Sequence, residues 1–260
     1  MIAIDLHTMS QGRPPLRTIQ RTFAVLDVLW TVDGAGPTEV AEQMDLPKST
    51  VYEYLRALAS TGYVVQADGK YRISYKFLSM GGRMRQRNRL FQIAKPELRK
   101  VAMETGELVN LNIEERSKSI IVHQEEGDQS LNLGTYPGME TPLHSHAAGK
   151  VLLAHLPEDV LERILDGHLE QVTDETITDP ATLRTELDQI RDQGYAVDWD
   201  QQVPGMGVVS VPILIDGRLF GSIGVVCPTG RLEDTSYQND LVRKIRETAN
   251  TITVNYKYGN

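Results

Sequence analysis

The spacing of hydrophobic residues changes twice between residues 37 and 73, and each change marks a new element of structure. Apolar residues spaced by three or four positions predict two short helices, the second over residues 48–60. Two alternating runs follow on either side of an Asp-Gly pair, which is a strong signal for a hairpin. A helix, a turn, a second helix and a small hairpin are the parts of a winged helix-turn-helix, in which the second helix enters a DNA major groove.

Capping residues predict where these elements begin and end. Thr38 can cap the first helix, and an acidic residue in its first turn suits the positive end of the helix dipole. Pro47 closes the turn between the helices, because its fixed φ angle suits the start of the second one. Gly62 ends that helix, and the hairpin strands are expected over residues 63–66 and 70–73.

The second helix turns Val51, Leu55 and Leu58 to one buried face, so its other face is polar. That face could merely pack against a neighbouring element, but it is rich in groups that suit phosphates and base edges. We therefore predict that this helix and the segments beside it bind double-stranded DNA. The predicted contact residues are Arg17, Arg21, Thr38, Lys48, Ser49, Thr50, Tyr52, Glu53, Arg56 and Lys70.

The flanking segments complete this domain and lead out of it. Residues 1–16 are predicted to form a flexible arm, and residues 18–32 the first helix of a three-helix core. A connecting helix is expected over residues 75–90, and its Gly-Gly pair is a position where it could bend. Its alternating arginines fit a solvated face and contact with the flanking DNA backbone equally well. A further helix is expected over residues 93–105, kinked or begun near Pro96.

From Glu107 onwards the chain mixes strands and helices without the strict alternation of a parallel βαβ fold. Strands are expected over residues 108–113, 120–123, 130–133, 195–199, 208–215 and 219–226. Helices are expected over residues 145–156, 158–166, 180–193 and 236–254. This order predicts an α+β fold in which helices pack against a mostly antiparallel central sheet.

Charge is divided unevenly along the 260 residues, a length that suits two domains. Residues 1–90 hold 12 Lys and Arg against 8 Asp and Glu, a balance of +4. Residues 91–260 hold 15 against 27, a balance of −12, and the two parts make up the net charge of −8. The acidity could reflect a salt-rich cell interior, but a basic first part beside an acidic remainder is expected when one end contacts a polyanion.

The single cysteine, Cys227, excludes an internal disulfide framework and fits a reducing compartment. Residues 1–15 are too polar for a signal peptide, and no run approaches the roughly 18 apolar residues that span a bilayer. We therefore expect a cytoplasmic protein. Nothing in the sequence points to a cofactor.

Three stretches resemble one protein family. Residues 48–64, KSTVYEYLRALASTGYV, match its recognition helix and the entry to its wing. Residues 144–156, HSHAAGKVLLAHL, are similar to its signature helix, and residues 176–213 resemble the block that follows. The family is the isocitrate-lyase-regulator (IclR) type of transcription factor, and the resemblance covers residues 17–255.

The resemblance implies three parts of the chain with different roles. They are a winged helix-turn-helix domain over residues 17–74, a linker helix over residues 75–92 and a GAF-like effector-binding domain over residues 93–260. The implied function is regulation of a metabolic pathway rather than catalysis, by a homodimer or dimer of dimers on palindromic DNA sites. The implied effector is a small metabolite, a carboxylate or sugar acid.

Positions that match the family's effector contacts are Leu133, Thr141, His146, Ala147, Ala148, Asp198, Val208, Gly224 and Val226. The amides of Ala147 and Ala148 would lie at a helix N-terminus, where unpaired N–H groups suit a carboxylate. Valine or glycine stands at three positions where the family commonly has serine or cysteine. This departure indicates a less polar pocket and a ligand larger than a two- or three-carbon keto acid, with an apolar or sugar-like body.

Glu53 is a second departure, because the family often has arginine at this position. A carboxylate on the groove-facing side can accept a hydrogen bond from cytosine N4 but repels phosphates. We expect it to change the DNA sequence that is read rather than to add affinity.

Two further kinds of chemistry compete with this prediction. His144 and His146 invite a metal site, but no carboxylate lies at ligand spacing and one cysteine cannot build a structural zinc site. The alternative function is a metabolite-binding enzyme whose N-terminal helices only mediate dimerisation. That hypothesis predicts a reactive cluster of Asp198, His146 and Cys227.

Overall fold

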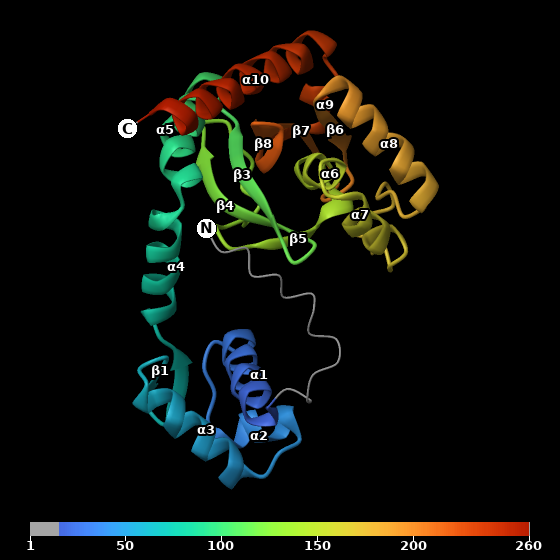
Figure 1. Ribbon diagram of the computed structural model, residues 1–260. Helices are drawn as coiled ribbons and strands as arrows, with labels where there is room; N and C mark the ends of the chain where they lie inside the picture. Colours follow the sequence, from blue (N-terminus) through green and yellow to red (C-terminus); the bar gives the residue numbers. More distant parts are fainter. Residues whose placement is uncertain (1–15, 260) are drawn as a thin grey trace. The chain divides into compact units, whose positions relative to one another are not determined.

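The computed structural model of the protein (Figure 1) describes residues 16–259, so the arm predicted over residues 1–16 lies almost wholly outside the described residues. The chain divides into two compact units, Met1–Arg83 and Met84–Asn260. Each unit has a hydrophobic core of its own. No helix in residues 16–259 is long and apolar enough to cross a membrane.

The first unit has the predicted winged helix-turn-helix fold. Its elements are α1 (Arg17–Thr31), α2 (Pro37–Met44), α3 (Lys48–Ser60), β1 (Val64–Ala67) and β2 (Lys70–Ile73). Apolar side chains from all of these elements, such as Val25, Leu55 and Tyr71, meet in one core. The hairpin turn consists of Asp68 and Gly69, both with positive φ, which is the backbone conformation that an Asp-Gly turn favours.

The start of α2 differs from the prediction, because Thr38 does not cap it. Gly36 is the N-cap residue, and Pro37 takes the first helical position, where its missing N–H leaves no hydrogen bond unmade. The Glu39 side chain accepts the Gly36 N–H at 2.8 Å. Proline and glutamate together begin the helix ahead of Thr38.

A single helix, α4 (Lys76–Arg87), follows the hairpin and runs through the Gly-Gly pair without interruption. The break comes at Asn88, whose side chain accepts the Phe91 N–H at 3.1 Å and thereby caps α5 (Arg89–Thr105). α5 begins earlier than expected and contains Pro96 within it.

The second unit is built on a six-stranded antiparallel sheet with the order β5-β4-β3-β8-β7-β6. Its strands are β3 (Leu108–Glu115), β4 (Lys118–Glu126), β5 (Glu140–Pro142), β6 (Ala196–Trp199), β7 (Met206–Ile215) and β8 (Arg218–Pro228). The strand predicted over residues 130–133 is wrong, since β5 pairs with β4 instead. Leu131 and Leu133 pack against a hydrophobic core, so their alternation reflects packing rather than strand pairing.

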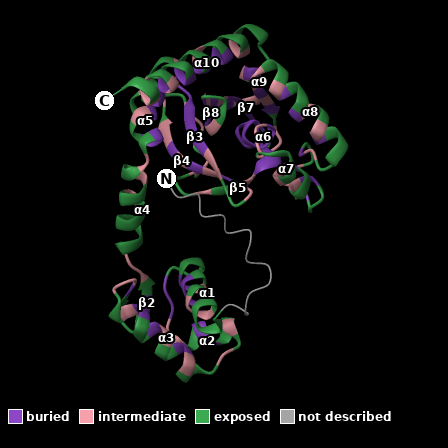
Figure 2. Ribbon diagram, in the orientation of Figure 1, coloured by how far each residue is buried: buried purple, intermediate pink, exposed green. Residues whose placement is uncertain are grey.

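Helices cover both faces of this sheet (Figure 1). One face carries α5, α9 (Thr229–Leu232) and α10 (Thr235–Tyr258). The other carries the 3-10 turn η2 (Leu143–Ser145), α6 (Ala147–Ala154), α7 (Glu158–Leu165) and α8 (Pro180–Gln193). Every residue of α6 is buried (Figure 2), because this helix lies between the sheet and α8.

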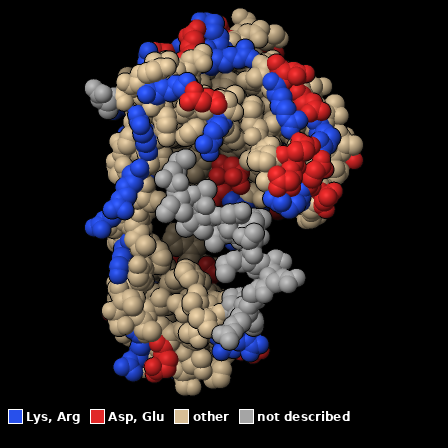
Figure 3. Space-filling view, viewed as in Figure 1, with Lys and Arg blue, Asp and Glu red and all other residues tan. Residues whose placement is uncertain are grey.

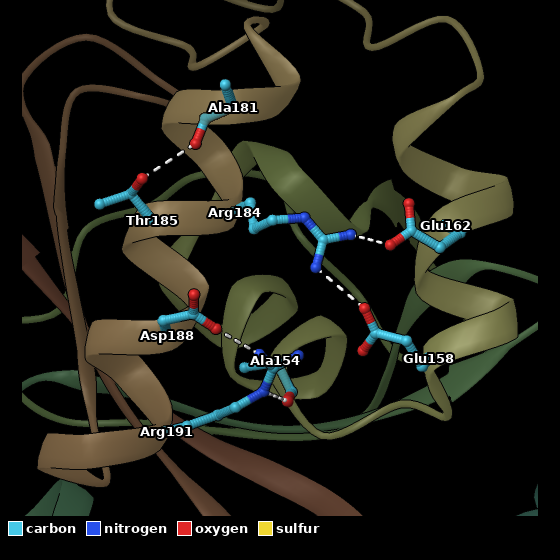
Figure 4. A network of polar contacts seen from close by, with 8 residues as sticks. All are labelled: Ala154, Glu158, Glu162, Ala181, Arg184, Thr185, Asp188 and Arg191. Carbon is cyan, nitrogen blue, oxygen red and sulfur yellow. Dashed lines mark hydrogen bonds and ion pairs between the residues drawn. The ribbon is translucent and has the colours of Figure 1, made fainter.

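Ion pairs join α7 and α8 on the outer surface (Figure 4). Arg184 on α8 pairs with Glu158 and Glu162 on α7. A hydrogen bond also joins α8 to α6, since Arg191 donates to the carbonyl of Ala154, the last residue of α6, at 2.5 Å. Figure 3 shows Asp and Glu side chains gathered over these two helices, in agreement with the acidic balance of residues 91–260. Exposed pairs of this kind orient α8 but contribute little stability individually.

Candidate functional site

Helix α3 has the polar face that the sequence predicts. Its apolar side is buried in the core, whereas Tyr52, Glu53 and Arg56 are exposed. A guanidinium nitrogen of Arg56 lies 3.8 Å from the Glu53 carboxylate, and its guanidinium carbon lies 5.8 Å from the centre of the Tyr52 ring. Exposed contacts of this kind are weak, so the guanidinium can exchange them for a phosphate or a base edge.

The remaining predicted DNA contacts lie in the same unit. Lys48 and Ser49 begin α3 and are exposed, and Thr50 beside them is half-buried. The others are spread over α1, α2 and β2, and they are Arg17, Arg21, Thr38 and Lys70. Of these four, only Arg21 is half-buried and the other three are exposed.

A cavity of about 100 Å³ lies in the second unit, between the sheet and the first turn of α6. Seven predicted effector residues line it: Leu133, Thr141, His146, Ala148, Val208, Gly224 and Val226. The sequence prediction missed a further group of lining residues: Asn110, Asn112, Ile121, Thr135, Met139, Gln202, Val203 and Met206. We refer to this cavity as the effector pocket, after the ligand site that the family resemblance implies at these residues.

Two of the missed residues carried a signal in the sequence. Asn110 and Asn112 alternate with apolar residues along β3, so both side chains point to the same face of the sheet. Met139, Gln202 and Val203 had no such signal. They lie in connecting segments, whose position in space depends on the whole fold and not on local spacing.

Ala147 and Asp198 were also predicted to contact the effector, but they contact each other and do not line the pocket. The Ala147 N–H donates to Oδ2 of Asp198, while Oδ1 of this buried carboxyl has no partner within residues 16–259. Burial raises the pKa of Asp198 to about 7, although the Ala147 N–H opposes this shift. The Ala148 N–H lies in the first turn of α6, where helix N–H groups have no acceptor within the helix.

His146 links the pocket wall to the start of α6. Its Nδ1 accepts the Gly149 N–H at 3.4 Å, so Nε2 carries the proton and donates to the Thr141 hydroxyl at 2.9 Å. The Thr141 hydroxyl in turn donates to the Ser119 carbonyl at 3.5 Å. Burial lowers the pKa of His146 to about 4, so the ring is neutral at physiological pH.

The polar groups of the pocket are all uncharged. Among the described residues that line it there is no Lys, Arg, Asp or Glu, and its one titratable group is the neutral ring of His146. Carboxamides, threonine hydroxyls and the Ala148 N–H at the start of α6 provide its hydrogen-bonding groups. A bound anion would therefore depend on N–H and O–H donors and on the positive end of α6, not on an ion pair.

Two glycines control the shape of this site. A Cβ on Gly149 would lie 2.4 Å from the Leu143 carbonyl oxygen, so only glycine lets α6 approach the η2 turn this closely. A Cβ on Gly224 would lie 3.5 Å from the Ala148 Cβ, which is an ordinary contact. Gly224 is thus not required by packing, and its missing side chain leaves room in the pocket.

The reactive cluster that the enzyme hypothesis predicts does not form. Cys227 is buried in the core under α5 and α10, whereas Asp198 contacts α6 on the opposite face of the sheet. Burial raises the pKa of the Cys227 thiol to about 12, which keeps it protonated. His144 is held by the Glu170 carbonyl at 2.9 Å, and no group of three or more His, Cys, Asp or Glu in residues 16–259 could hold a metal ion.

Comparisons with known proteins identify the family to which both parts of the chain are similar. Residues 18–68 match the family described as the IclR helix-turn-helix domain, and residues 83–254 match the bacterial transcriptional regulator IclR C-terminal family. The regulator BhcR of Paracoccus denitrificans is 34% identical over 84% of this chain and 80% of its own. The regulator KdgR of Escherichia coli is 29% identical over 93% of each chain.

Solved structures extend the likeness to the fold. The crystal structure of the Thermotoga maritima IclR protein has a TM-score of 0.77 and 29% identity, and the match covers 94% of this chain and 99% of that one. An IclR homologue from Microbacterium hydrocarbonoxydans, complexed with 4-hydroxybenzoate, has a TM-score of 0.80 and 24% identity, over 92% and 99% of the two chains. The chain therefore belongs to the IclR family: it is a DNA-binding transcription regulator with a C-terminal effector-binding domain, and not an enzyme.

Proposed function

We propose that this regulator controls a metabolic pathway by binding a palindromic operator, and that a small carboxylate or sugar acid in the effector pocket alters that binding. The proposal assigns DNA binding to residues 17–74, transmission to residues 75–92 and effector binding to residues 93–260. The observation that carries it is a pocket closed by the first turn of α6, in a chain whose α3 has an exposed polar face. By binding one arrangement of the domains better than another, the effector would shift the population of DNA-binding molecules.

The size of the pocket supports an effector of intermediate length. A water-sized atom takes roughly 10–15 Å³ of such a cavity, so about 100 Å³ suits a ligand with roughly ten non-hydrogen atoms. A keto acid of two or three carbons has only about five or six non-hydrogen atoms and would fill roughly half of this space. The carboxylate end of the longer ligand fits the Ala148 N–H at the start of α6, where the helix dipole favours negative charge.

On the DNA side, we assign base readout to the exposed middle of α3. Arg56 can reach a phosphate or a guanine edge, and Glu53 can accept from cytosine N4. Lys48, Ser49, Thr50 and Tyr52 would contact the DNA backbone or base edges from the same helix. The remaining predicted contacts would position the helix through phosphates, and they are Arg17, Arg21, Thr38 and Lys70.

Exposed apolar side chains support self-association as a homodimer or dimer of dimers. On α1, Ile19 and Phe23 lie one turn apart and are 54% and 60% exposed, and Trp30 is 69% exposed. On α4, Leu78 and Met84 are 70% and 73% exposed. Exposed apolar side chains of this kind are stabilised when a second copy covers them. A twofold dimer would require operator half-sites about 34–36 Å apart, or a multiple of this distance.

The test is a fluorescence-anisotropy titration of the full chain on the DNA upstream of its own gene, at several salt concentrations, with random DNA as the control. We expect binding at least roughly a thousandfold tighter than to random DNA, with an affinity that falls steeply as salt rises. Equal binding to both DNAs would contradict the proposed operator.

A further inference from the structure

The end of α3 and the start of α4 are joined at Tyr63, the residue that leads from α3 into the hairpin. Its N–H donates to the Leu58 carbonyl in the last turns of α3 at 3.2 Å, and its carbonyl accepts the Ser74 N–H at 3.0 Å. The Ser74 hydroxyl in turn accepts the Lys76 N–H, at the first position of α4, at 3.1 Å. The backbone of Tyr63 therefore links the end of α3 to the residue that begins α4.

The side chain of Tyr63 extends this link to three positions on α4. The Lys76 ammonium lies 4.1 Å from the centre of the Tyr63 ring, and the centre of the Phe77 ring lies 5.1 Å from it at an interplanar angle of 58°. The Tyr63 hydroxyl donates to the Met80 sulfur at 3.2 Å. A cation over an aromatic face and a tilted aromatic pair are both favourable contacts, so this ring holds the first turns of α4 against the end of α3.

Lys76 also contacts the end of α3 directly. Its ammonium donates to the carbonyl of Thr61, the C-cap residue of α3, at 2.5 Å. The last carbonyls of a helix have no partner within it and carry the negative end of the helix dipole. Because α3 has no basic residue in its own last turn, the cation that its end attracts comes from α4.

These contacts make the position of α3 depend on that of α4. α4 is one uninterrupted helix, Lys76–Arg87, so a rotation or shift along it reaches its first turn. Lys76 is exposed and Tyr63 is half-buried, and exposed contacts are individually weak. The joint is therefore rigid only while its contacts act together, and one substitution can loosen it without opening the core.

We propose that Lys76 and Tyr63 are positioning residues that fix α3 to α4 as one rigid piece, an inference that rests on the operator binding proposed above. In a twofold dimer, the separation of the two copies of α3 must match the spacing of the half-sites. A rigid joint lets the α4 helices set that separation, so an effector that shifts them changes DNA binding. A loose joint lets each α3 bind its half-site independently, and discrimination between spacings is lost.

The experiment measures how strongly DNA binding depends on half-site spacing. The purified full chain selects its best-bound palindrome from random DNA, and two further versions carry two base pairs more or two fewer at the centre. We call the ratio of the affinities for the selected and the altered spacing, measured by fluorescence anisotropy, the spacing ratio. In the unaltered protein we expect a spacing ratio of roughly thirtyfold or more, because two base pairs displace a half-site by about 7 Å along the DNA axis and about 70° around it.

Substitutions at the joint should lower the spacing ratio. Lys76→Met keeps the apolar stem but removes the ammonium from both the Thr61 carbonyl and the Tyr63 ring, so we expect the ratio to fall roughly fivefold or more. Tyr63→Leu, which removes the ring, should act in the same direction. Lys76→Arg keeps a cation and should preserve the ratio. Lys100→Met is the matched control, because it makes the same change at an exposed lysine on α5 and should leave the ratio unaltered.

The spacing ratio separates a positioning role from a direct contact with DNA. A lysine that only neutralised a phosphate would weaken binding to all spacings equally and reduce the slope of the salt dependence by about one. Lys76 is exposed, so Lys76→Met should unfold at the same temperature as the unaltered protein. If Tyr63→Leu does not fold, the Lys76 variants decide the question alone.

Three results would overturn the inference: a spacing ratio near one in the unaltered protein, an unchanged ratio in Lys76→Met, or an equal fall in Lys100→Met. Each of them, beside tight binding of a selected sequence, contradicts the rigid joint and leaves the proposed function intact. If the unaltered protein selects no sequence over random DNA, the proposed function fails, and the inference that rests on it fails as well.

Discussion

The polar face of α3 and the polar lining of the effector pocket differ in almost every physical respect. The side chains of Glu53 and Arg56 are 73% and 63% exposed, carry charge and touch each other loosely. In the pocket, Asn110 and His146 are each 8% exposed, uncharged and surrounded by packed elements. An exposed face can therefore change its chemistry with little effect on folding, whereas each polar group of the pocket is coupled to the fold that buries it.

Asp198→Asn tests this coupling most strongly. Burial raises the pKa of Asp198 to about 7, well above its value in the unfolded chain, so its contribution to stability is complete at low pH and is lost as pH rises towards 7. Asparagine does not titrate and still offers an oxygen to the Ala147 N–H. The free energy of unfolding of the variant, minus that of the unaltered protein, should therefore rise by roughly 2–4 kcal/mol between about pH 4 and about pH 8.

Chemical unfolding at several pH values measures this difference. The opposite shift of His146, whose pKa is lowered, is present in both proteins and cancels in the subtraction. Asp188→Asn, which removes a carboxylate with a 61% exposed side chain on α8, is the matched control for the change from aspartate to asparagine. A difference for Asp198→Asn that stays flat with pH would mean that this carboxyl is not held in a buried, protonated form.

Gly149→Ala should destabilise the second unit by roughly 3 kcal/mol, because the new Cβ would lie 2.4 Å from the Leu143 carbonyl oxygen and the backbone would have to move. Gly224→Ala is the control within the same pocket. Its Cβ meets only ordinary contacts, so stability should stay within roughly 1 kcal/mol while the volume left for an effector decreases. Thermal unfolding of both variants checks the pair, and equal losses would show that α6 does not pack as closely as described.

The contrast between locally determined and fold-determined features also explains how much could be predicted from the sequence. The ends of α3 at Lys48 and Ser60 and of α8 at Pro180 and Gln193 agree with the prediction, because helix starts and stops depend on residues close by in the chain. The predicted strand over residues 130–133 failed for the opposite reason. The alternation of apolar residues over 130–133 is a local pattern, but strand pairing is not local. The segment that pairs with β4 is β5, a short strand that has no local signal of its own.

Predicting the residues that line the pocket depended even more on contacts between segments that are far apart in the sequence. The residues matched by resemblance, such as Thr141 and Val208, line the cavity because the family preserves the fold around them. The alternation of Asn110 and Asn112 with apolar residues could be seen in the sequence, but the sequence did not show that both residues line a pocket. That Asn110 lies between Gly224 on β8 and Gln124 on β4 follows only from the strand order and register.

On the exposed face, Arg56→Ala should weaken operator binding by roughly tenfold to a hundredfold and leave the unfolding temperature unchanged. The guanidinium is exposed and only loosely paired with Glu53, so its loss removes a DNA contact without opening a cavity. Anisotropy titrations on the operator and on random DNA measure the effect. Arg243→Ala on α10, which alters another exposed arginine with acidic neighbours, should leave DNA binding unchanged. A loss of stability in Arg56→Ala would break the contrast between the two regions.

Glu53→Gln should have the smallest effect on affinity and the clearest effect on sequence preference. A carboxylate accepts from cytosine N4, whereas a glutamine side chain pairs with adenine N6 and N7, so the preferred base at one operator position should change from cytosine to adenine. Removing the negative charge also releases Arg56 from its 3.8 Å ion pair and reduces repulsion from phosphates, so binding to random DNA should strengthen by roughly twofold to threefold. Competition with operators varied at single positions measures the base preference. An unchanged preference would mean that Glu53 does not face a base, and that this face contacts DNA through its backbone alone.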